Sequence, residues 1–438
     1  MQLLASASAL PQRLATVASP TQWLARARAA GFCQRQPKKI APLAFLHGLS
    51  LWAFQPVVSL RLAAACIGLC TGFTVSKQAV AKRFSPAAVV FLRDALAAVM
   101  ARLAQQTARV SPAALAMFRR VLVHDSTAVT LPAHLAAAFP GNANGQGQPF
   151  AVLKIQCVVD LLAEQFVQWR LTSFRVNDLA AAPDLLAVAA PGDLVVRDLG
   201  YFVLATLAAL RARGAEFLSR LRMGVSVLRA DGPEEFDLLG ALRRQGTLDV
   251  HVRLGVAEQL PVRLVAVPVP AAVANERRRR ARQNRDRRHP PSKERLLLLG
   301  WDILITSVGA EVWSAETVCR VYGLRWRIEI VFKSWKSHFH LTAVAAGDAV
   351  EVELLIWARL LLVTLLHGWL AAEAVVSGGA PLSLLKLAQW FALWGSVLLL
   401  GPLAVEFVRP WREQARYHCR YERRRKRFNY VEKLQMLG

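Results

Sequence analysis

The stretch from Ser314 to Lys336 constrains the fold more than any other part of the chain. It contains no proline, its only glycine is Gly323, and its apolar residues recur at helical spacing. Ser314 is a suitable N-cap, and Glu316 stands in the first turn, where a negative charge stabilises a helix. The pattern therefore predicts one amphipathic helix over residues 314–336.

The two faces of this predicted helix differ in chemistry. The apolar face predicts a contact with the core, and its residues are Ile328, Val331, Phe332 and Trp335. The other face spans an arc of roughly 80° and carries Tyr322, Arg325, Glu329, Lys333 and Lys336. A solvated face usually balances charges of opposite sign, whereas this face carries three cations against one carboxylate. The helix alone leaves a solvated face and a functional face both open.

Positive charge is concentrated in three parts of the sequence. The net charge is +25, yet the chain has 11 Lys and Arg and no acidic residue before Asp94. Residues 275–295 hold 10 basic and 3 acidic side chains, and residues 409–433 hold the same numbers. The remainder is neutral, whereas a chain that is merely basic would show an even scatter. Localised positive charge indicates a polyanionic partner, either nucleic acid or an anionic membrane surface.

Neither the cysteines nor the apolar runs point to export or membrane insertion. The six cysteines form no CxxC pair, so the sequence predicts neither a disulfide framework nor a zinc site and favours a reducing cytoplasm. Residues 387–405 form a 19-residue uncharged run, near the length of a membrane-spanning helix, but Gly401-Pro402 interrupts it. The N-terminus has no signal-peptide layout. We expect buried helices of a soluble protein, with a basic membrane protein as the less favoured alternative.

Helical patterns fill the region from residue 41 to about residue 103, and two of them form a helix-turn-helix layout. Residues 59–70 and 76–84 each suit one helix, and the glycine-containing turn 71–75 joins them. The second helix carries the candidate DNA contacts, which are Lys77, Gln78, Lys82 and Arg83. Helix pairs are common, so this prediction depends on the absence of acidic residues from this part of the chain.

Apolar strands alternate with helices between residues 119 and 221. The pattern is typical of three strands (121–131, 151–160 and 164–172) followed by a helix (178–190) and a fourth strand (191–198). A second helix, which ends near residue 213, and a fifth strand (217–221) complete the series. This order predicts a mixed α/β sheet. Residues 222–310 contain further strand-like runs interrupted by an Arg-rich stretch, which predicts a β-rich insertion with a basic loop. Beyond His340 the chain is helical to about residue 408 and ends in a basic tail that includes residues 423–427.

Two acidic residues interrupt apolar strands, where a carboxylate is costly unless it is paired or bound to a cation. Asp125 stands in the middle of the first strand, and Asp198 ends the fourth. Each alone is commonly a strand-end or core polar residue. Together with Glu329 they form three carboxylates on three elements that a mixed sheet and a packed helix could bring together. Oxygen ligands suit Mg²⁺ or Mn²⁺, and two such ions support phosphoryl displacement.

The segments around these acids resemble the DDE transposases of bacterial insertion sequences, specifically the insertion-sequence-four family. The resemblance rests on Asp125-Ser126-Thr127, on Asp198-Leu199-Gly200-Tyr201-Phe202 and on the spaced signature Tyr322-x2-Arg325-x3-Glu329-x6-Lys336. The complete spacing of the Tyr-Arg-Glu-Lys signature makes the match specific, and the resemblance spans residues 41–375 in order and spacing. Leu199 departs from many relatives, which carry a basic residue after the second Asp.

The resemblance implies an RNase H-like mixed sheet interrupted by a β-rich insertion and flanked by N-terminal and C-terminal helical regions. It implies that Asp125, Asp198 and Glu329 are the catalytic residues and ligands of Mg²⁺, with Mn²⁺ as the alternative. It also implies that Tyr322, Arg325, Lys333 and Lys336 contact DNA phosphates. Trp301 lies where the family's insertion offers an aromatic side chain to a flipped base; a core aromatic in an apolar strand fits Trp301 equally well.

The residues and the resemblance together predict a cut-and-paste DNA transposase that acts on transposon ends and target DNA, in the cytoplasm and on the nucleoid. The resemblance further implies a homodimer that holds the two transposon ends. A catalytically inactive, transposase-derived DNA-binding protein is the alternative. The predicted organisation begins with a basic N-terminal segment (1–40) and a helical DNA-binding domain (41–112). The catalytic domain follows in two parts (113–221 and 311–375), which the β-rich insertion (222–310) separates. A C-terminal helical region with a basic tail (376–438) ends the chain.

Overall fold

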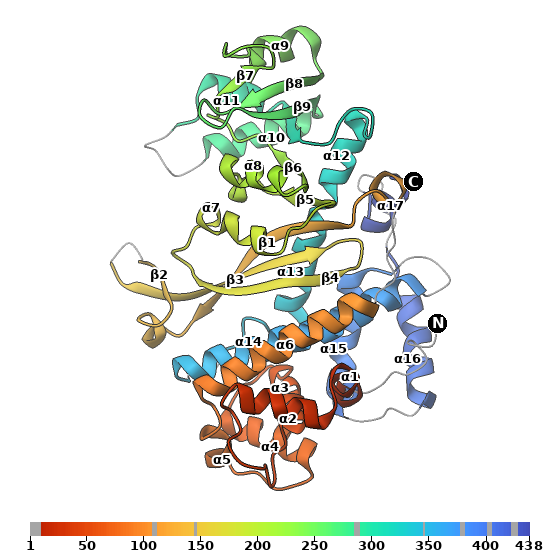
Figure 1. Ribbon diagram of the computed structural model, residues 1–438. Coiled ribbons are helices and arrows are strands. Elements are labelled where there is room, and N and C mark those ends of the chain that lie inside the picture. Colours follow the sequence, from red (N-terminus) through yellow and green to blue (C-terminus); the bar gives the residue numbers. More distant parts are fainter. Residues whose placement is uncertain are drawn as a thin grey trace.

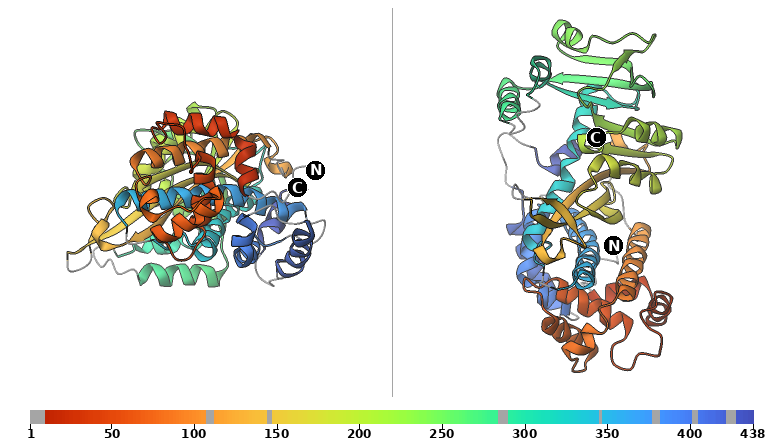
Figure 2. Two further views of the ribbon diagram at one scale, coloured as in Figure 1. Left: turned by 90° about the horizontal axis from the view of Figure 1, so that it is seen from below. Right: turned by 90° about the vertical axis from the view of Figure 1, so that its left-hand side faces the viewer.

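The computed structural model describes residues 10–106, 112–143, 147–283, 290–344, 347–376, 382–400, 405–421 and 428–438. The predicted basic tail at residues 423–427 lies outside the described residues, as do residues 1–9 and residues 284–289 of the Arg-rich stretch. The molecule is elongated, with helices at one end, a sheet in the middle and the insertion at the other end (Figure 1; Figure 2). The central sheet therefore lies between a helical region and the β-rich insertion along the long axis of the molecule.

A mixed sheet forms the centre of the molecule. In the described part of the chain it has ten strands, which are β1 (Arg120–Leu131), β2 (Pro140–Ala143), β3 (Pro149–Asp160), β4 (Gln165–Ser173), β5 (Asp193–Arg197), β6 (Glu216–Arg220), β7 (Val227–Arg229), β8 (Leu248–Leu254), β9 (Leu260–Pro268) and β10 (Trp301–Thr306). Strand β1 pairs antiparallel with β3, β3 pairs antiparallel with β4, and β1, β5 and β6 run parallel. The predicted mixed α/β sheet with helical flanks is confirmed.

Both faces of the central strands are buried. Along β1, Val121 and Val123 face the same cluster as the N-terminal helices, while Leu122 between them belongs to the cluster on the other face. In β5, Leu194 likewise belongs to the cluster of the N-terminal helices, and its neighbour Val195 belongs to the cluster on the other face. Successive strand residues point to opposite faces, so a sheet covered on both sides reads as a continuous apolar run. A polar side chain in such a strand therefore needs a specific partner.

The insertion continues this sheet. Strand β10 pairs antiparallel with β6 on one side and with β9 on the other, so the strands of residues 222–310 extend the central sheet edgewise. The helices of this part are α9 (Leu238–Gln245), α10 (Ala271–Arg282) and α11 (Lys293–Leu298). Residues 276–282 thus form a helix where a basic loop was expected. Glu276 explains the difference, because it pairs with both Arg279 and Arg280 at helical spacing.

The N-terminal helices form a layer on one end of the sheet. They are α1 (Leu10–Val17), α2 (Pro20–Ala29), α3 (Pro42–Ala53), α4 (Leu60–Thr71), α5 (Lys77–Ala81) and α6 (Pro86–Gln106). The two helices of the predicted helix-turn-helix are present as α4 and α5. Gly72 ends α4 with a φ of 73°, a left-handed conformation that glycine adopts without strain, and Ser76 caps α5. Helix α5 has only five residues.

Shorter helices cover the other face of the sheet. They are α7 (Asp178–Ala181), α8 (Leu204–Ala212) and the 3₁₀ turns Ala182–Ala187 and Leu199–Tyr201. The 3₁₀ turns Ala113–Leu115 and Ala133–Leu135 instead place Leu115 and Leu135 in the cluster that the N-terminal helices share. The helix expected over residues 178–190 is therefore a single α-turn that continues as a 3₁₀ helix. Pro183 lies in the first turn of the 3₁₀ segment, where its missing backbone N–H prevents the α-helical bond to the preceding turn.

Long helices near the C-terminus complete the helical end. They are α14 (Ala349–Val376), α15 (Leu384–Leu400), α16 (Val405–His418) and the short α17 (Tyr430–Gln435). Helix α14 is nearly apolar, and its fully buried Arg359 donates hydrogen bonds to the backbone oxygens of Ala53 and Leu341. Among the described residues, no helix is long and apolar enough to cross a membrane.

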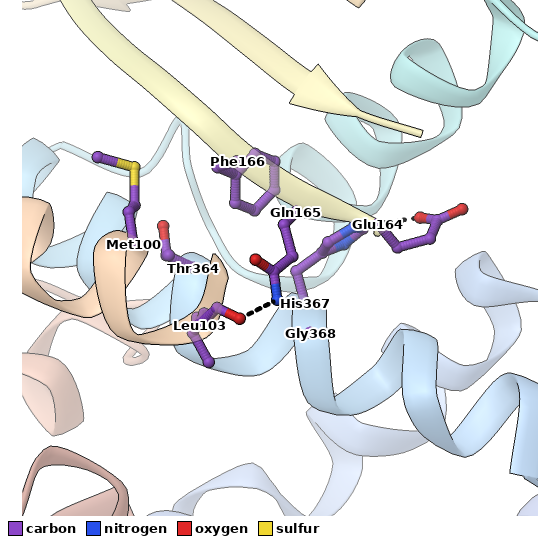
Figure 3. Close-up of a pocket in the computed structure, with 8 residues that line it drawn as sticks. All are labelled: Met100, Leu103, Glu164, Gln165, Phe166, Thr364, His367 and Gly368. Carbon is purple, nitrogen blue, oxygen red and sulfur yellow. Dashed lines mark hydrogen bonds and ion pairs between the residues drawn. The ribbon is translucent and has the colours of Figure 1, made fainter. Parts of the chain in front are cut away.

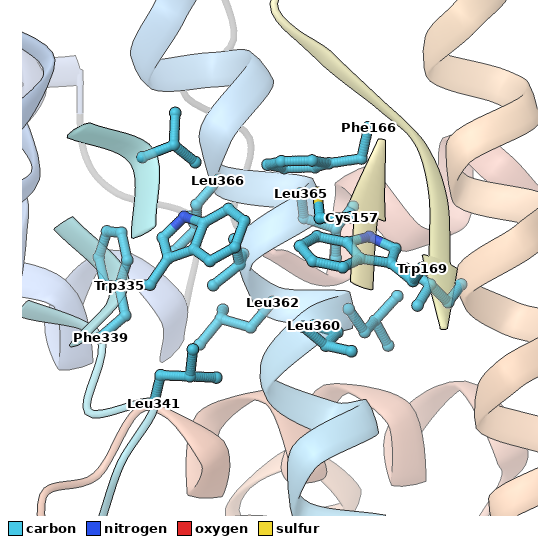
Figure 4. Packing of buried hydrophobic residues seen from close by; sticks show 14 of the residues in the cluster. Cys157, Phe166, Trp169, Trp335, Phe339, Leu341, Leu360, Leu362, Leu365 and Leu366 are labelled. Atoms are coloured by element: carbon cyan, nitrogen blue, oxygen red, sulfur yellow. The ribbon is translucent and has the colours of Figure 1, made fainter. Parts of the chain in front are cut away.

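The predicted long helix over residues 314–336 is two helices, α12 (Ala315–Gly323) and α13 (Trp326–His338). At the junction, the amides of Leu324 and Arg325 bond to carbonyls three residues back rather than four. The backbone tightens there without leaving the helical region. The apolar face is confirmed as core: Trp335 of α13 lies 5.1 Å from the rings of both Phe166 and Trp169, ring centroid to centroid (Figure 4).

Candidate active site

The sheet register brings Asp125 and Asp198 together. In the parallel pair of β1 and β5, His124 is the Cα partner of Arg197, so the next residues along the two strands are Asp125 and Asp198. Asp125 shares a face of β1 with Val121 and Val123, and this is the face on which α13 packs. Both carboxylates therefore lie at the same edge of neighbouring strands, below the helix that carries Glu329.

Helix α13 holds Glu329 over these strands. Ile328 and Val331 are fully buried on either side of Glu329 in sequence, whereas the Glu329 side chain is 38% exposed. Buried apolar neighbours fix the rotation of the helix about its axis, because turning it would expose them to water. The carboxylate of Glu329 is held by the packing of its neighbours, and it remains open to solvent and to a ligand.

A single guanidinium lies among the three acids. Nη2 of Arg325 donates a hydrogen bond to Oε1 of Glu329 at 3.0 Å. Its Nη1 lies 3.6 Å from Oδ2 of Asp125, and its Nε lies 3.7 Å from Oδ1 of Asp198. Arg325 is only 7% exposed, although it lies among three partly exposed carboxylates. One positive charge thus faces three negative charges, which leaves the cluster with a deficit of two positive charges.

The electrostatics of Asp125 reflect this deficit. Burial, which disfavours the ionised form, raises the pKa of Asp125 from 3.8 to about 6. The backbone N–H of Ser126 and the Arg325 guanidinium act in the opposite direction, while Asp198 and Glu329 raise the value further. Asp125 is consequently a carboxylate that the fold stabilises incompletely in its charged form. Strongly perturbed groups of this kind gather at functional sites.

The donor set of the cluster suits a hard divalent cation. Carboxylate oxygens are the ligands that Mg²⁺ and Mn²⁺ prefer, and a charge of +2 matches the deficit of the cluster. Within the described part of the chain, no group of three His, Cys, Asp or Glu side chains is already arranged so that it could hold a metal ion. The acids are organised around Arg325 instead. The chemistry of the residues fits a divalent cation, and their present arrangement fits the guanidinium.

Tyr322 extends the site beyond the acids. The side chain is 7% exposed, and the guanidinium of Arg220 on β6 lies 5.5 Å from the centre of its ring. Burial raises the pKa of the Tyr322 phenol to about 12, and the charges of Arg220 and Arg325 counteract this shift. The phenol is therefore neutral near pH 7. Five residues of the predicted set form one continuous cluster, which consists of Asp125, Asp198, Tyr322, Arg325 and Glu329.

Comparisons with known proteins agree with this geometry. Residues 116–365, more than half of the chain, match the family described as the transposase DDE domain. This chain belongs to the DDE transposase family. The family consists of enzymes that cleave and transfer DNA strands, and the matched residues include Asp125, Asp198 and Glu329. The predicted relation to transposases of insertion sequences is confirmed.

Individual relatives of this DDE transposase carry the same description. The chain is 30% identical over 318 residues to the transposase for insertion sequence element IS231C of Bacillus thuringiensis subsp. berliner, covering 68% of this chain and 66% of that protein. It is 28% identical over 342 residues to the transposase for IS231F of Bacillus thuringiensis subsp. israelensis, covering 73% and 71%. The match thus spans about two thirds of the length of these relatives.

One solved structure is also similar in outline. The piggyBac transposase in a synaptic complex with hairpin DNA superimposes with a TM-score of 0.40 at 9% identity, over 92% of this chain and 82% of that one.

Two predicted phosphate contacts, Lys336 of the signature and the additional Lys333, lie further along α13 of this transposase. Lys333 and Lys336 are exposed, and they follow Glu329 toward the C-terminal end of the helix. Together they form an accessible positive surface beside the acid cluster, consistent with a phosphate contact. Their predicted role remains a prediction, because the cluster itself contacts only Arg325 among the predicted cations.

Trp301 lies away from the acids, at the start of β10. Its indole Nε1 donates a hydrogen bond to the backbone oxygen of Gly246 at 2.6 Å, and its ring packs on the apolar cluster of the insertion. The contacts of this side chain are those of a structural aromatic residue. The ring is only partly buried, and its predicted stacking on a base stays a prediction.

The predicted helix-turn-helix contacts lie at the opposite end of the molecule, on and beside α5 (Figure 1). Lys77, Gln78 and Lys82 are exposed. Arg83 is half-buried, and its guanidinium donates a hydrogen bond to the backbone oxygen of Ala79 at 3.1 Å. Three of the four side chains are thus available to a ligand, and Arg83, in the turn after α5, is bonded to the backbone of that helix.

Sequence reasoning missed a polar layer beside Asp125. Oγ of Ser126 donates a hydrogen bond to Oδ1 of Asp178 at 3.1 Å, and Nζ of Lys154 donates to the same oxygen at 3.1 Å. On the other face of β1, the buried His124 contacts Arg197. One signal was available: His124 and Arg197 directly precede the two acids, so the alternation of strand residues places them together on the opposite face.

Proposed function

We propose that this member of the DDE transposase family performs cut-and-paste transposition of an insertion sequence, with Asp125, Asp198 and Glu329 as ligands of Mg²⁺ or Mn²⁺. The observation that carries the proposal is the convergence of three carboxylates, from two strands and a helix, on one guanidinium. One guanidinium offsets only one of the three negative charges, so the cluster can still take up a cation. The names of the relatives, transposases for insertion sequence elements, support the same reading.

The divalent ions would supply activation of water and stabilisation of the attacking and leaving oxygens at phosphorus. The residues of this chain bind and orient. The three carboxylates would hold the cations at one edge of the sheet, and the buried positions of their backbone neighbours fix that edge. Tyr322, Arg325, Lys333 and Lys336 would bind phosphate oxygens of the DNA strand along α12 and α13. Arg325 would then exchange part of its contact with the acids for a phosphate.

The distribution of charge supports double-stranded DNA as the partner. The described part of the acid-free stretch, residues 10–93, lies in the helical end, and the described parts of the Arg-rich stretch, residues 275–283 and 290–295, lie in the insertion, on the opposite side of the acid cluster. A duplex passing over the cluster would meet positive charge in both directions. We further propose that two copies of the chain hold the two transposon ends, and that the protein works in the cytoplasm on nucleoid DNA.

The proposal is tested with purified protein, Mg²⁺ and linear DNA that carries the ends of the element. Wild-type protein should cleave at the element's ends and join the freed 3′ ends to target DNA. Asp125→Asn, Asp198→Asn and Glu329→Gln should each lower the cleavage rate by a factor of about 10³ or more while binding of end DNA persists. Glu234→Gln, which removes an exposed acid of the insertion, is the matched control and should cleave like wild type.

Two outcomes would contradict the proposal. Cleavage by any of the three acid variants at the wild-type rate would remove that residue from the set of ligands. Wild-type protein that binds end DNA tightly but never cleaves it would favour the alternative, a transposase-derived DNA-binding protein without activity. Recovery of the protein in the membrane fraction rather than with nucleic acid would contradict the proposed location.

A further inference from the structure

A short segment near the C-terminus is docked against the junction between α12 and α13. Helix α17 is closed at its start by a capping box in which Asn429 and Glu432 bond to each other's backbone N–H groups. This reciprocal cap gives a helix of only six residues a defined position. The segment lies more than 100 residues away in sequence from the helices that it contacts. A contact of this range reflects tertiary packing rather than local structure.

Tyr430 covers a buried arginine of α13. The centre of its ring lies 4.3 Å from the guanidinium carbon of Arg327, close enough for a cation–π contact. The Tyr430 hydroxyl donates a hydrogen bond to the backbone oxygen of Leu161 at 3.3 Å. Leu161 lies in the turn between β3 and β4. Tyr430 therefore joins α13 to the sheet through one side chain.

Lys433 and Arg320 tie the same segment to α12. Nζ of Lys433 donates a hydrogen bond at 3.1 Å to the backbone oxygen of Gly323, the last residue of α12. Nη1 of Arg320 donates at 2.7 Å to the backbone oxygen of Met436. A helix end leaves carbonyl oxygens without partners, and a lysine is well suited to satisfy one of them. Both bonds lie within five residues of Arg325.

Arg327 is also held by a buried carboxylate, that of Glu164. Its Nε donates a hydrogen bond to Oε1 of Glu164 at 2.8 Å, and Nε2 of His367 on α14 lies 3.3 Å from Oε2 of the same carboxylate. Figure 3 shows Glu164 and His367 beside each other where β4 begins. Arg327 and Glu164 are both largely buried, with side chains 5% and 15% exposed. The guanidinium is thus held between a carboxylate and an aromatic ring.

The geometry of a helix relates this contact to the acid cluster. Residues two apart on an α-helix point about 200° away from each other, so Arg327 and Glu329 face opposite sides of α13. Arg325 and Glu329, four apart, share one side, and they are hydrogen-bonded. Tyr430 and Glu164 therefore hold α13 from the side opposite to the one that faces Asp125 and Asp198.

We propose that Tyr430 and Lys433 are positioning residues, which set the junction of α12 and α13 and thereby hold Arg325 and Glu329 against Asp125 and Asp198. The proposal rests on the function proposed above for those four residues. It assigns a role to part of the basic C-terminal region for which the sequence offers no motif. Because a displacement of about 1 Å at a reacting centre can reduce a rate by roughly 10², loosening the junction should lower cleavage far more than DNA binding.

The test uses the full chain and four variants. Tyr430→Leu removes the ring from Arg327, while Tyr430→Phe keeps the ring and removes only the hydroxyl. Lys433→Met removes the bond to Gly323, and it is the milder change if Tyr430→Leu does not fold. Gln435→Ala, at an exposed position of the same helix, is the matched control. The readouts are hydrogen exchange of backbone amides 326–331 against those of α6, the affinity for end DNA, and the cleavage rate at saturating DNA.

We expect exchange in residues 326–331 to accelerate about tenfold or more in Tyr430→Leu and Lys433→Met, with α6 unchanged. Cleavage at saturating DNA should fall about ten- to a hundredfold, and the affinity for end DNA should stay within about twofold. Tyr430→Phe should restore most of both properties.

Two results would overturn the proposal. One is unchanged exchange in residues 326–331 of the folded variants. The other is a loss of DNA affinity with a smaller salt dependence and no change in exchange, which would make Tyr430 and Lys433 DNA contacts. Hydrogen exchange needs no catalysis, so a wild-type protein that fails to cleave contradicts the proposed function while the exchange result still decides the positioning role.

Discussion

Arg325 and Arg327 stand two residues apart, are both buried, and both contact carboxylates, but their surroundings differ in one respect. Arg327 faces one carboxylate, Glu164, which His367 and Tyr430 help to enclose. Arg325 faces three carboxylates, from Asp125, Asp198 and Glu329. The first arrangement balances its charges, and the second lacks two positive charges. The comparison separates an ion pair that serves the structure from a cluster that is prepared for a cation.

The pKa values of Glu164 and Asp125 shift in opposite directions, because the two carboxylates differ in how much positive charge lies near each of them. Burial alone would raise the pKa of Glu164, but Arg327 and His367 outweigh it and lower the value to about 2. At Asp125 burial dominates, and the single guanidinium shared with two other acids does not outweigh it, so the pKa rises to about 6. A carboxylate with its own cation is stabilised in the charged form. A carboxylate that shares one cation with two others is not.

The largest expected effect comes from removing Arg327. Arg327→Met leaves Glu164 buried without its cation, and breaking a buried pair in this way costs about 3–5 kcal/mol of unfolding free energy. Arg325→Met leaves three carboxylates that water reaches, so its cost should be smaller, about 1–2 kcal/mol. Denaturant unfolding of both variants gives the two values. Equal losses of unfolding free energy in Arg327→Met and Arg325→Met would contradict the distinction between the two sites. If Arg327→Met does not fold, the double variant Glu164→Gln/Arg327→Met, which removes both charges, should recover much of the lost stability.

A smaller effect of opposite sign is expected at Asp125. Asp125→Asn removes a charge that the fold stabilises poorly, so the variant should be more stable than wild type by about 1–3 kcal/mol near pH 7. Glu164→Gln, the matched change at the balanced site, should lower the stability. Thermal and denaturant unfolding in the presence of a chelator measure both. A loss of stability in Asp125→Asn would show that the acid cluster is an ordinary structural network.

The pH dependence of stability sharpens the same comparison. Glu164 has a folded pKa of about 2, below the ordinary 4.5, so its contribution is complete above pH 4.5 and is lost as the pH falls toward 2. Asp125 has a folded pKa of about 6, above the ordinary 3.8, so stability should fall as the pH rises from about 4 to 6. Each variant, Glu164→Gln or Asp125→Asn, should remove its own part of the profile. Identical profiles for wild type and either variant would contradict the assignment.

The sequence predicted the acid cluster better than it predicted the arginine pair. Asp125 and Asp198 were predictable because an acid in an apolar strand is costly, and Glu329 because its helix carried a charged face opposite an apolar one. The mixed α/β sheet followed from the order of apolar runs. The break between α12 and α13 was not predictable, because no proline marks it and the contacts at the junction are tertiary, from α17 near the C-terminus.

The pairing of Arg327 with Glu164 could not be predicted either. The two residues lie 163 positions apart, and Glu164 stands in a turn with a φ of 49°, an uncommon conformation for a residue other than glycine. Helical spacing places Arg327 beside the apolar residues, where an arginine gives no sign of its partner. The sequence could not decide between a structural and a DNA-stacking role for Trp301 either. A tryptophan in an apolar run suits a hydrophobic core and a stacking site equally well.

Calorimetric titration of the metal-free protein with Mn²⁺ tests the central claim most directly, since Mn²⁺ has the same ligand preferences as Mg²⁺. If the acid cluster lacks two positive charges, wild-type protein should bind one or two Mn²⁺ ions, and Glu329→Gln should weaken that binding by about tenfold or more. Glu164→Gln, at the balanced site, should bind Mn²⁺ like wild type. Absence of Mn²⁺ binding, or equal binding by wild type and Glu329→Gln, would contradict the account.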